Sequence, residues 1–235
     1  MGTVVVTGAG RGLGLAFATQ LAARGDTVFA TVRDPERAEA LRALEGDVRL
    51  VRLDVSDPAS IEAAAASVAE QTAHVDLLVN NAGINSRGVP EGQGNVRFGT
   101  LEPRGILRMV EVNAIGPLLV TQAFAGLLQK SAAGRVLSIS SWLGSIAGKT
   151  SGGNYGYCAS KTTLNMLMRA AAFDLVQQGV ISVVANPGWV STDMGGPRAS
   201  LTPDQSVAGL LQVADALTPE QAGRFVDWDG SEHAW

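Results

Sequence analysis

The sequence contains few of the residues that bind metals or form disulfides. Of its 235 residues one is a cysteine, Cys158, and two are histidines, His74 and His233. Neither histidine has a second histidine or a cysteine at metal-ligand spacing, and a single cysteine cannot form an internal disulfide. We therefore expect no metal site, no disulfide framework and a cytoplasmic location.

The chain also lacks an excess of positive charge and a long apolar run. Its 18 Lys and Arg residues against 22 Asp and Glu give a formal net charge of −4. A protein that binds nucleic acid through broad electrostatic attraction has the opposite balance. No apolar stretch approaches the ~18 residues that a membrane span needs, and an apolar run begins at Thr3, before any basic leader region. The sequence thus predicts neither nucleic-acid binding nor membrane insertion.

What the chain does contain is an alternation of apolar, β-branched runs with helix-like segments, typical of βαβ units on a parallel sheet. The expected strands are 3–7, 27–32, 48–53, 75–80, 135–140, 180–185 and 223–227. The expected helices are 12–24, 35–44, 58–72, 105–130 with a break near Asn113, 155–178 and 203–217. Asp34-Pro35 and Asp57-Pro58 place an N-cap carboxylate before a first-turn proline. We predict one α/β domain over residues 1–235, a Rossmann-type doubly wound sheet of about seven parallel strands with helices on both faces.

The first expected strand runs directly into a glycine-rich turn and then a helix. The turn is Thr7-Gly8-Ala9-Gly10-Arg11-Gly12-Leu13-Gly14. Glycines let the backbone approach a pyrophosphate, and a helix N-terminus offers unpaired N–H groups. The G-x-G-x-x-G spacing fails at Leu13, and the spacing present is T-G-x-x-x-G-x-G. We expect a dinucleotide site here, with a tight turn that needs glycine only for packing as the alternative.

A second glycine-rich segment, 144–150, also follows an expected strand and ends in Gly-Lys-Thr. It has three residues between its glycines where a nucleoside-triphosphate loop has four. We therefore do not expect a phosphate loop there.

Tyr157 and Lys161 lie four residues apart in an expected helix, so they share one face. A tyrosine titrates near pH 10, and proton transfer at neutral pH needs a shift of ~3 units, or ~4 kcal/mol. A nearby ammonium and a positively charged nicotinamide could supply that shift. The alternative is a tyrosine stacked along the lysine stem. Ser140 and Ser141 end the fifth strand, where ligands of open α/β sheets bind, although they could equally cap a turn.

Together these residues resemble the short-chain dehydrogenase/reductase family over essentially the whole chain. The resemblance rests on the glycine-rich turn, Asn-Asn-Ala-Gly at 80–83, Val-Asn-Ala around Asn113, the Tyr157 to Lys161 segment and Asn-Pro-Gly-Trp-Val at 186–190. The run 141–157, the segment 189–196 and Asp-Gly-Ser-Glu at 229–232 are similar to the branch that includes Sniffer carbonyl reductases and C-factor.

The resemblance implies a catalytic tetrad of Asn113, Ser141, Tyr157 and Lys161. In this interpretation Ser141 holds a carbonyl, Tyr157 passes the proton, Lys161 lowers the tyrosine pKa and binds the nicotinamide ribose, and Asn113 anchors a relay water. Ser140 competes with Ser141. The implied cofactor contacts, besides Tyr157 and Lys161, are Gly8, Gly10, Arg11, Gly12, Leu13, Gly14, Arg33, Asp54, Val55, Asn81, Ala82, Gly83, Pro187, Gly188, Val190 and Thr192.

The choice of nicotinamide cofactor depends on the end of the second strand. Asp34 lies 20 residues after Gly14, where an acid that binds the ribose of NAD is expected, but it already suits a helix cap. By resemblance Val32 stands where NAD-preferring members carry the acid, and Arg33 marks a preference for NADP. Arg33 together with Arg11 could bind a 2′-phosphate. We expect NADP(H), with NAD(H) as the alternative. Asp54-Val55 would cover the adenine, unless Asp54 only forms a turn.

The sequence therefore predicts NADPH-dependent reduction of a small carbonyl compound, or the reverse oxidation of a secondary alcohol. The alternative is a dinucleotide-binding signalling or regulatory protein. Trp142 and Trp189 could wall the substrate pocket. The segments 85–105 and 195–200 are either an active-site loop and lid or surface excursions. Apolar faces on 105–130 and 155–178 could pair between subunits of a homo-oligomer or pack on the sheet.

Overall fold

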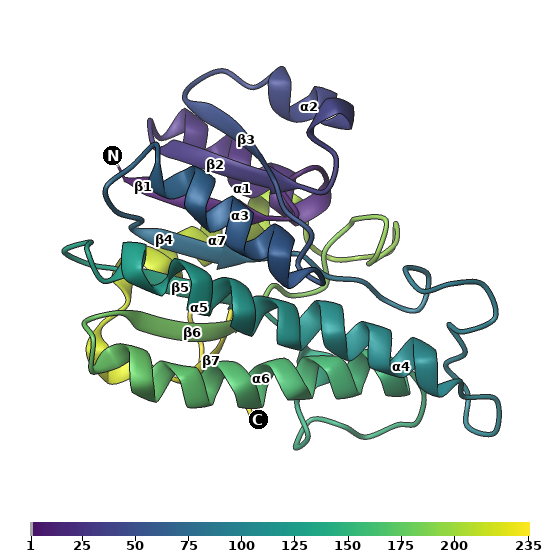
Figure 1. The fold of residues 1–235 in the computed structure, drawn as a ribbon. Helices are drawn as coiled ribbons and strands as arrows, with labels where there is room; N and C mark the ends of the chain where they lie inside the picture. The colour runs from purple at the N-terminus through teal and green to yellow at the C-terminus, as the bar shows by residue number, and fades with distance from the viewer. Residues whose placement is uncertain (1) are drawn as a thin grey trace.

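The computed structural model describes residues 2–235, which form a seven-stranded, wholly parallel sheet (Figure 1). The strand order is β3-β2-β1-β4-β5-β6-β7, so the chain winds outward in both directions from β1 and β4. The strands are β1 Thr3–Thr7, β2 Thr27–Val32, β3 Val48–Arg52, β4 Leu77–Asn80, β5 Arg135–Ile139, β6 Ile181–Asn186 and β7 Phe225–Asp227. All seven predicted strands and the doubly wound topology are confirmed. The ends of β1 and β2 are those predicted, and the other strands differ by one or two residues at one or both ends.

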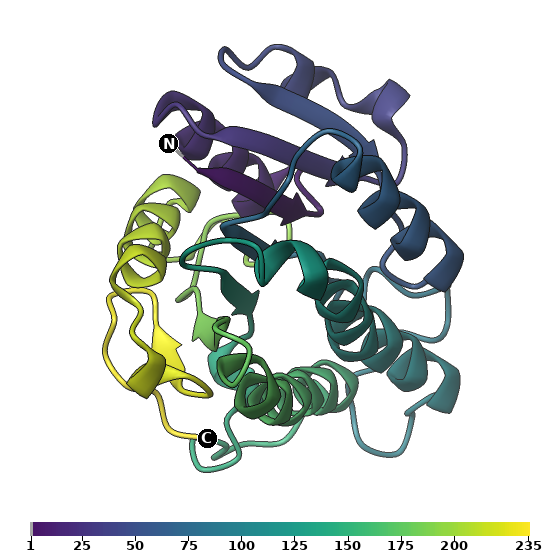
Figure 2. The same cartoon turned by 60° about the vertical axis from the view of Figure 1, so that its left-hand side comes forward.

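Helices cover both faces of this sheet (Figure 2). The helices are α1 Gly12–Ala23, α2 Glu39–Arg42, α3 Pro58–Ala69, α4 Pro103–Val110, α5 Gly116–Leu128, α6 Tyr155–Val176 and α7 Pro203–Ala216. Helices α1, α2 and α7 pack on one face, and α3, α5 and α6 pack on the other. Successive residues of β1 serve opposite faces, because Val4 and Val6 join the first core and Val5 joins the second.

The predicted helix 35–44 is wrong as one element. The chain forms a 3-10 turn at Pro35–Arg37 and the short helix α2, and Ala38 between them leaves helical dihedrals with φ −98° and ψ 49°. The predicted N-caps are confirmed. The Asp34 carboxylate accepts from the backbone N–H of Glu36 at 3.1 Å, and that of Asp57 accepts from Ala59 at 3.0 Å.

The predicted break near Asn113 is a π-helical turn, Glu111–Ile115, which joins α4 to α5. Pro117 lies four residues after Asn113 in the first turn of α5. Proline has no N–H, so the backbone carbonyl of Asn113 lacks the donor that an α-helix would supply. The π turn therefore places an acceptor without its usual helical partner on the helix that flanks the site edge.

The expectation that no segment is long and apolar enough to span a membrane needs a correction. The continuous helical run Pro103–Leu128 meets that test by length and composition. It is one such helix, and half of its most apolar window is buried inside the fold. A core helix meets the same test, and the packing of α5 against the sheet accounts for its apolar composition.

The apolar faces of α5 and α6 pack on the sheet, as one of the two alternatives predicted. Val120 and Phe124 of α5 and Leu164 and Met168 of α6 belong to the same buried core. A homo-oligomer stays a prediction.

Candidate active site

The parallel sheet gathers the predicted site segments at one edge. Because every strand runs in the same direction, the turns after their carboxyl ends all emerge at that edge, to the right in Figure 1. The segments are the glycine-rich turn after β1, Arg33 after β2, Asp54 after β3, Asn81 to Gly83 after β4, Ser141 after β5 and Pro187 to Gly188 after β6.

The glycine-rich turn is held against the segment that follows β4. The Thr7 hydroxyl accepts hydrogen bonds from the backbone N–H groups of Asn81 and Ala82, at 2.9 and 3.0 Å. The Asn81 amide in turn donates to the carbonyl of Thr7 at 2.9 Å. Gly8 has φ +64°, and a Cβ there would lie 2.9 Å from the Cα of Ala82. The two backbones meet so closely that only glycine fits at position 8.

The remaining glycines of the turn face two other site segments. A Cβ on Gly10 would lie 3.3 Å from Val32 at the end of β2, and one on Gly12 would lie 3.4 Å from the methyl group of Thr192. The first residue of α1 is preceded by Arg11, whose side chain makes no cap hydrogen bond. The N–H groups of this helix terminus therefore suit an anion such as a pyrophosphate.

Arg11 takes part in an exposed ion pair in this structure. Its guanidinium forms a 3.0 Å ion pair with Asp193, and the backbone carbonyl of Asp193 accepts from Arg87 at 3.0 Å. These contacts join the glycine-rich turn to Arg87 of the predicted active-site loop, through a residue that precedes the predicted lid. The expected pairing of Arg11 with Arg33 at a 2′-phosphate is thus not preformed.

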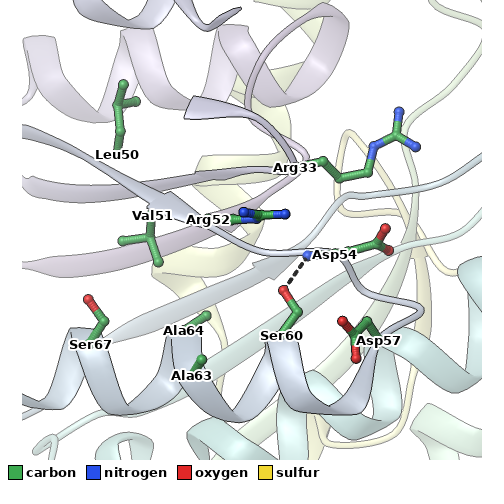
Figure 3. A pocket seen from close by; sticks show the side chains of 10 residues that line it. All are labelled: Arg33, Leu50, Val51, Arg52, Asp54, Asp57, Ser60, Ala63, Ala64 and Ser67. Atoms are coloured by element: carbon green, nitrogen blue, oxygen red, sulfur yellow. Dashed lines mark hydrogen bonds between the residues drawn. The ribbon is translucent and has the colours of Figure 1, made fainter. Parts of the chain in front are cut away.

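An open cavity of about 530 Å³ lies at the other end of the site, between β3 and α3 (Figure 3). Arg33, Arg52 and Asp54 all line it. The Asp54 carboxylate accepts from the N–H and hydroxyl of Ser56, at 3.0 and 2.7 Å, as its predicted turn-forming role requires. Burial alone would raise the pKa of Asp54, but the Ser56 hydrogen bonds and nearby arginines, Arg33 among them, hold it below the usual value.

Arg52 was missed by the sequence interpretation. It pairs in register with Val32, the residue before Arg33, and neither arginine forms an ion pair with any residue of 2–235. The sequence signal that could have found Arg52 is its place at the end of β3. This strand lies next to β2, which Arg33 follows. The cavity therefore presents Arg33 with Arg52, where Arg33 with Arg11 was expected from the sequence.

Tyr157, Lys161 and Ser141 are brought together beside this edge. Tyr157 and Lys161 share a face of α6, with the Lys161 Nζ 5.8 Å from the phenol ring centre. The Ser141 side chain lies beside the Tyr157 phenol and acts to lower its pKa. The ammonium donates to the backbone carbonyl of Ile139 at 2.8 Å. A Cβ on Gly83 would lie 3.8 Å from that Nζ, so the lysine reaches the segment after β4.

The two candidate serines differ in what they contact. The Ser140 hydroxyl is buried and donates to the side-chain carbonyl of Asn165 at 2.5 Å. The Ser141 hydroxyl instead faces Tyr157 and also accepts from the N–H of Leu143 at 3.2 Å. Geometry therefore favours Ser141 as the serine that meets a substrate carbonyl.

Asn113 is fully buried, and its side chain is used to hold other site segments. Its amide donates to the carbonyl of Ile84 at 2.8 Å and to the hydroxyl of Ser160 at 2.9 Å, and its Oδ1 accepts from the N–H of Ile84 at 2.7 Å. Both amide protons are occupied. A contact of Asn113 with a relay water would fall to its backbone carbonyl, the one that lacks its helical donor.

The side-chain pKa values differ from the expectation of an acidified tyrosine. Burial raises the pKa of Tyr157 to about 12, although the neighbouring Ser141 side chain opposes the rise. Burial also lowers the pKa of Lys161 to about 8. The ammonium points to Ile139 rather than to the phenol, which explains why the chain alone does not lower the tyrosine pKa.

Lys161 gives a testable pH dependence of stability. Below pH 8 its amine is charged in the folded and the unfolded chain, and the cost of burying that charge opposes folding by about 3 kcal/mol. Between pH 8 and 10.5 the unfolded chain binds more protons, so the free energy of unfolding rises with pH. Relative to Lys161→Met, we expect the wild type to gain about 2 kcal/mol between pH 7.5 and 10 in urea unfolding. A difference between the two proteins that stays constant across this range would contradict the assigned burial.

Other predicted features lie at the rim of the site. Trp142 and Trp189 are each about half exposed, and the Trp189 indole N–H donates to the carbonyl of Gly195 at 2.9 Å.

The glycine-rich segment 144–150 is followed by turns, and α6 begins only at Tyr155, so no helix N-terminus faces it as a phosphate loop requires. Within residues 2–235, no group of three or more His, Cys, Asp or Glu side chains could hold a metal ion.

Comparison with known proteins agrees with this geometry. The family model for short chain dehydrogenases matches residues 2–201. The C-signal protein of Myxococcus xanthus is 43% identical over 164 residues, which cover 70% of this chain and 95% of that protein. The structure of an NADPH-bound carbonyl reductase from chicken fatty liver superposes with a TM-score of 0.90 at 38% identity, over 99% of this chain and 98% of that one. Carbonyl reductase Sniffer of D. melanogaster gives a TM-score of 0.92 at 30% identity over the full length of both chains. The chain thus belongs to the short-chain dehydrogenase family and is an oxidoreductase of the short-chain type.

Proposed function

We propose that the protein is an NADPH-dependent carbonyl reductase that also runs in reverse on secondary alcohols. The observation that carries this proposal is the phenol of Tyr157, which lies beside the Ser141 side chain and the Lys161 amine. These three side chains stand at the sheet edge next to the glycine-rich turn. The structural resemblance to two carbonyl reductases, one of them NADPH-bound, supports the same assignment.

The residues present fit NADP(H). The α1 terminus with Gly8 to Gly14 suits the pyrophosphate, because its N–H groups carry no side-chain cap. Arg33 and Arg52 suit the 2′-phosphate and Asp54 suits the adenine, since all three line the cavity. Val55, which follows Asp54, is proposed as a second adenine contact. The contacts proposed for the nicotinamide half are Asn81, Ala82, Gly83, Pro187, Gly188, Val190, Thr192, Tyr157 and Lys161. When bound, NADPH supplies the hydride.

The side chains of the chain itself divide the remaining work. Ser141 donates a hydrogen bond to the substrate carbonyl, and Tyr157 transfers its proton to the developing alkoxide. Lys161, with a pKa of about 8, is still mostly protonated at pH 7 and would bind the nicotinamide ribose. The backbone carbonyl of Asn113 accepts from a water that returns the proton. Each role is a proposal that substitution can test.

The direct test is turnover of the purified protein with a panel of aldehydes, ketones and secondary alcohols. We expect consumption of NADPH with at least one carbonyl compound, and a higher kcat/KM with NADPH than with NADH. Tight NADPH binding without turnover of any compound would contradict the proposal.

Arg33 provides a prediction for cofactor choice. A charge-assisted hydrogen bond contributes about 1.5–3 kcal/mol, so Arg33→Gln should raise the KM for NADPH roughly 10- to 100-fold. The KM for NADH should change less than twofold, since NADH has no 2′-phosphate. Arg37→Gln is a matched control, because Arg37 is exposed and does not line the cavity. Equal losses with both cofactors would show that Arg33 does not read the phosphate.

The 43% identity with the C-signal protein favours a second candidate, a dinucleotide-binding signalling or regulatory protein. Both functions would use the same cofactor site, and a cytoplasmic location stays a prediction for either. They differ in whether Tyr157 does chemistry. A phenotype in cells that survives Tyr157→Phe but is lost when the glycine-rich turn is disrupted would favour the signalling protein.

A further inference from the structure

The turn that carries Ser141 is held from two sides. On one side, the Gly144 carbonyl accepts from the Thr162 hydroxyl at 3.0 Å and from the Asn165 amide at 3.3 Å, both on α6. On the other side, the backbone N–H of Trp142, which follows Ser141, donates to the side-chain carbonyl of Asn186 at 3.1 Å. The position of Ser141 therefore depends on the orientation of the Asn186 amide.

Asn186 is itself held by a carboxylate from β7. Its amide nitrogen donates to Asp227 Oδ1 at 2.5 Å, while its Oδ1 also accepts from the N–H of Gly188 at 3.3 Å. The other carboxylate oxygen, Asp227 Oδ2, lies 2.9 Å from His233 Nδ1. A carboxylate only accepts, so Nδ1 is the donor. The chain of contacts runs from His233 through Asp227 and Asn186 to the turn at Ser141.

The segment that carries His233 is fixed by further contacts. The His233 N–H donates to the Phe225 carbonyl at 2.9 Å, and the two rings meet edge to face with centres 4.5 Å apart. The carbonyl of Trp235 accepts from the N–H of Ala147 at 2.7 Å, and the guanidinium of Arg169 lies 4.5 Å from the Trp235 ring. The segment thus contacts the serine-bearing loop at Ala147 as well as through Asn186.

We propose that His233 and Asp227 are positioning residues that hold the Ser141 turn in place through Asn186. The inference rests on the proposed reductase function for its catalytic consequence, but its structural consequence is independent of that function. The Asp227 side chain is partly exposed. Without the His233 donor its carboxylate can turn toward water, which releases the Asn186 amide. The Trp142 N–H then loses a fixed acceptor, and Ser141 loses its alignment with Tyr157.

Three variants test this pair. His233→Leu keeps an apolar side chain of similar bulk and removes the donor. His233→Asn keeps an N–H donor near the position of Nδ1. His74→Leu is the control, because His74 also lies beside a carboxylate, 3.4 Å from Asp76, but precedes β4 at the opposite edge of the sheet.

The first readout is hydrogen exchange of the backbone amides, measured by mass spectrometry on peptides that cover residues 141–149. We expect faster exchange in His233→Leu and wild-type exchange in both His233→Asn and His74→Leu. Wild-type protection in His233→Leu would overturn the proposal, as would equal loss in His233→Asn. This arm decides the inference even if the wild type reduces no carbonyl compound, a result that would overturn only the proposed function.

The second readout is steady-state kinetics with NADPH and whichever carbonyl compound the wild type reduces. Misplacement of a reacting group by about 1 Å can cost on the order of 100-fold in rate, so a partial release should lower kcat about tenfold in His233→Leu. His233→Asn should recover most of it. A purely structural pair would lower the midpoint of thermal unfolding and leave kcat of the folded enzyme unchanged, which would overturn the proposal.

Discussion

Tyr157→Phe is expected to abolish nearly all turnover while NADPH still binds. The substitution removes the hydroxyl that lies beside Ser141 and keeps the ring that packs beside Lys161. A positioned general acid contributes about 10²- to 10⁴-fold, so kcat should fall by that factor. The fall is measured by NADPH oxidation with the best carbonyl substrate, and cofactor binding by calorimetric titration.

Tyr155 offers a matched control for this experiment. It lies two residues earlier at the first position of α6, and its ring contacts Phe98 with centres 6.2 Å apart. Tyr155→Phe keeps that contact and should retain turnover within about twofold of the wild type. If Tyr157→Phe kept comparable turnover, the assignment of Tyr157 as the proton donor would be wrong.

Gly14→Ala is expected to unfold the start of α1 or to displace it from the glycine-rich turn. A Cβ on Gly14 would lie 2.2 Å from the carbonyl oxygen of Gly8, 2.6 Å from the Asn81 amide nitrogen and 2.9 Å from the Cα of Ala9. Two of these atoms belong to backbone that cannot rotate away. Overpacking of this kind costs about 3 kcal/mol or more. The free energy of urea unfolding should fall accordingly, and NADPH affinity should fall at least 100-fold.

Gly126→Ala separates this effect from the general cost of changing a helical glycine. Gly126 lies within α5, and nothing lies within 4 Å of where its Cβ would be. Alanine in a helix interior is favoured over glycine by about 0.5–1 kcal/mol, so this variant should be more stable than the wild type. Wild-type stability and NADPH affinity in Gly14→Ala would contradict the close packing of the turn.

The parts of this structure that the sequence predicted are those decided by local patterns. A buried parallel strand is a short apolar run, which is why the strand at 3–7 and the order of strands and helices could be predicted. The start of α3 at Asp57-Pro58 could be predicted because the N-cap involves only residues close in sequence. Tyr157 and Lys161 share a face because four residues make about one helical turn.

What could not be predicted depends on residues far apart in the chain. The partner of Arg11 is Asp193, 182 residues away, and no local pattern links them. Ser140 and Ser141 look alike in sequence, and it is Asn165 on α6 that takes the Ser140 hydroxyl. The pKa of Tyr157 rises instead of falling because burial, a property of the whole fold, outweighs the opposing effect of Ser141.

The strand order has a consequence for how a cell makes this protein. Helix α1 leaves the ribosome early, yet Phe17 and Leu21 on its buried face pack in the same core as Val207 and Leu210 of α7, almost 200 residues later. Strand β1 likewise gains its second neighbouring strand only after β4 has been synthesised. Contacts between such distant residues form late, and the nascent chain carries exposed apolar surface until they do. The half that carries the glycine-rich turn is therefore synthesised first, but its apolar surface is fully buried only after α7 has been made. Chaperones have an extended period in which they can bind this surface of the nascent chain.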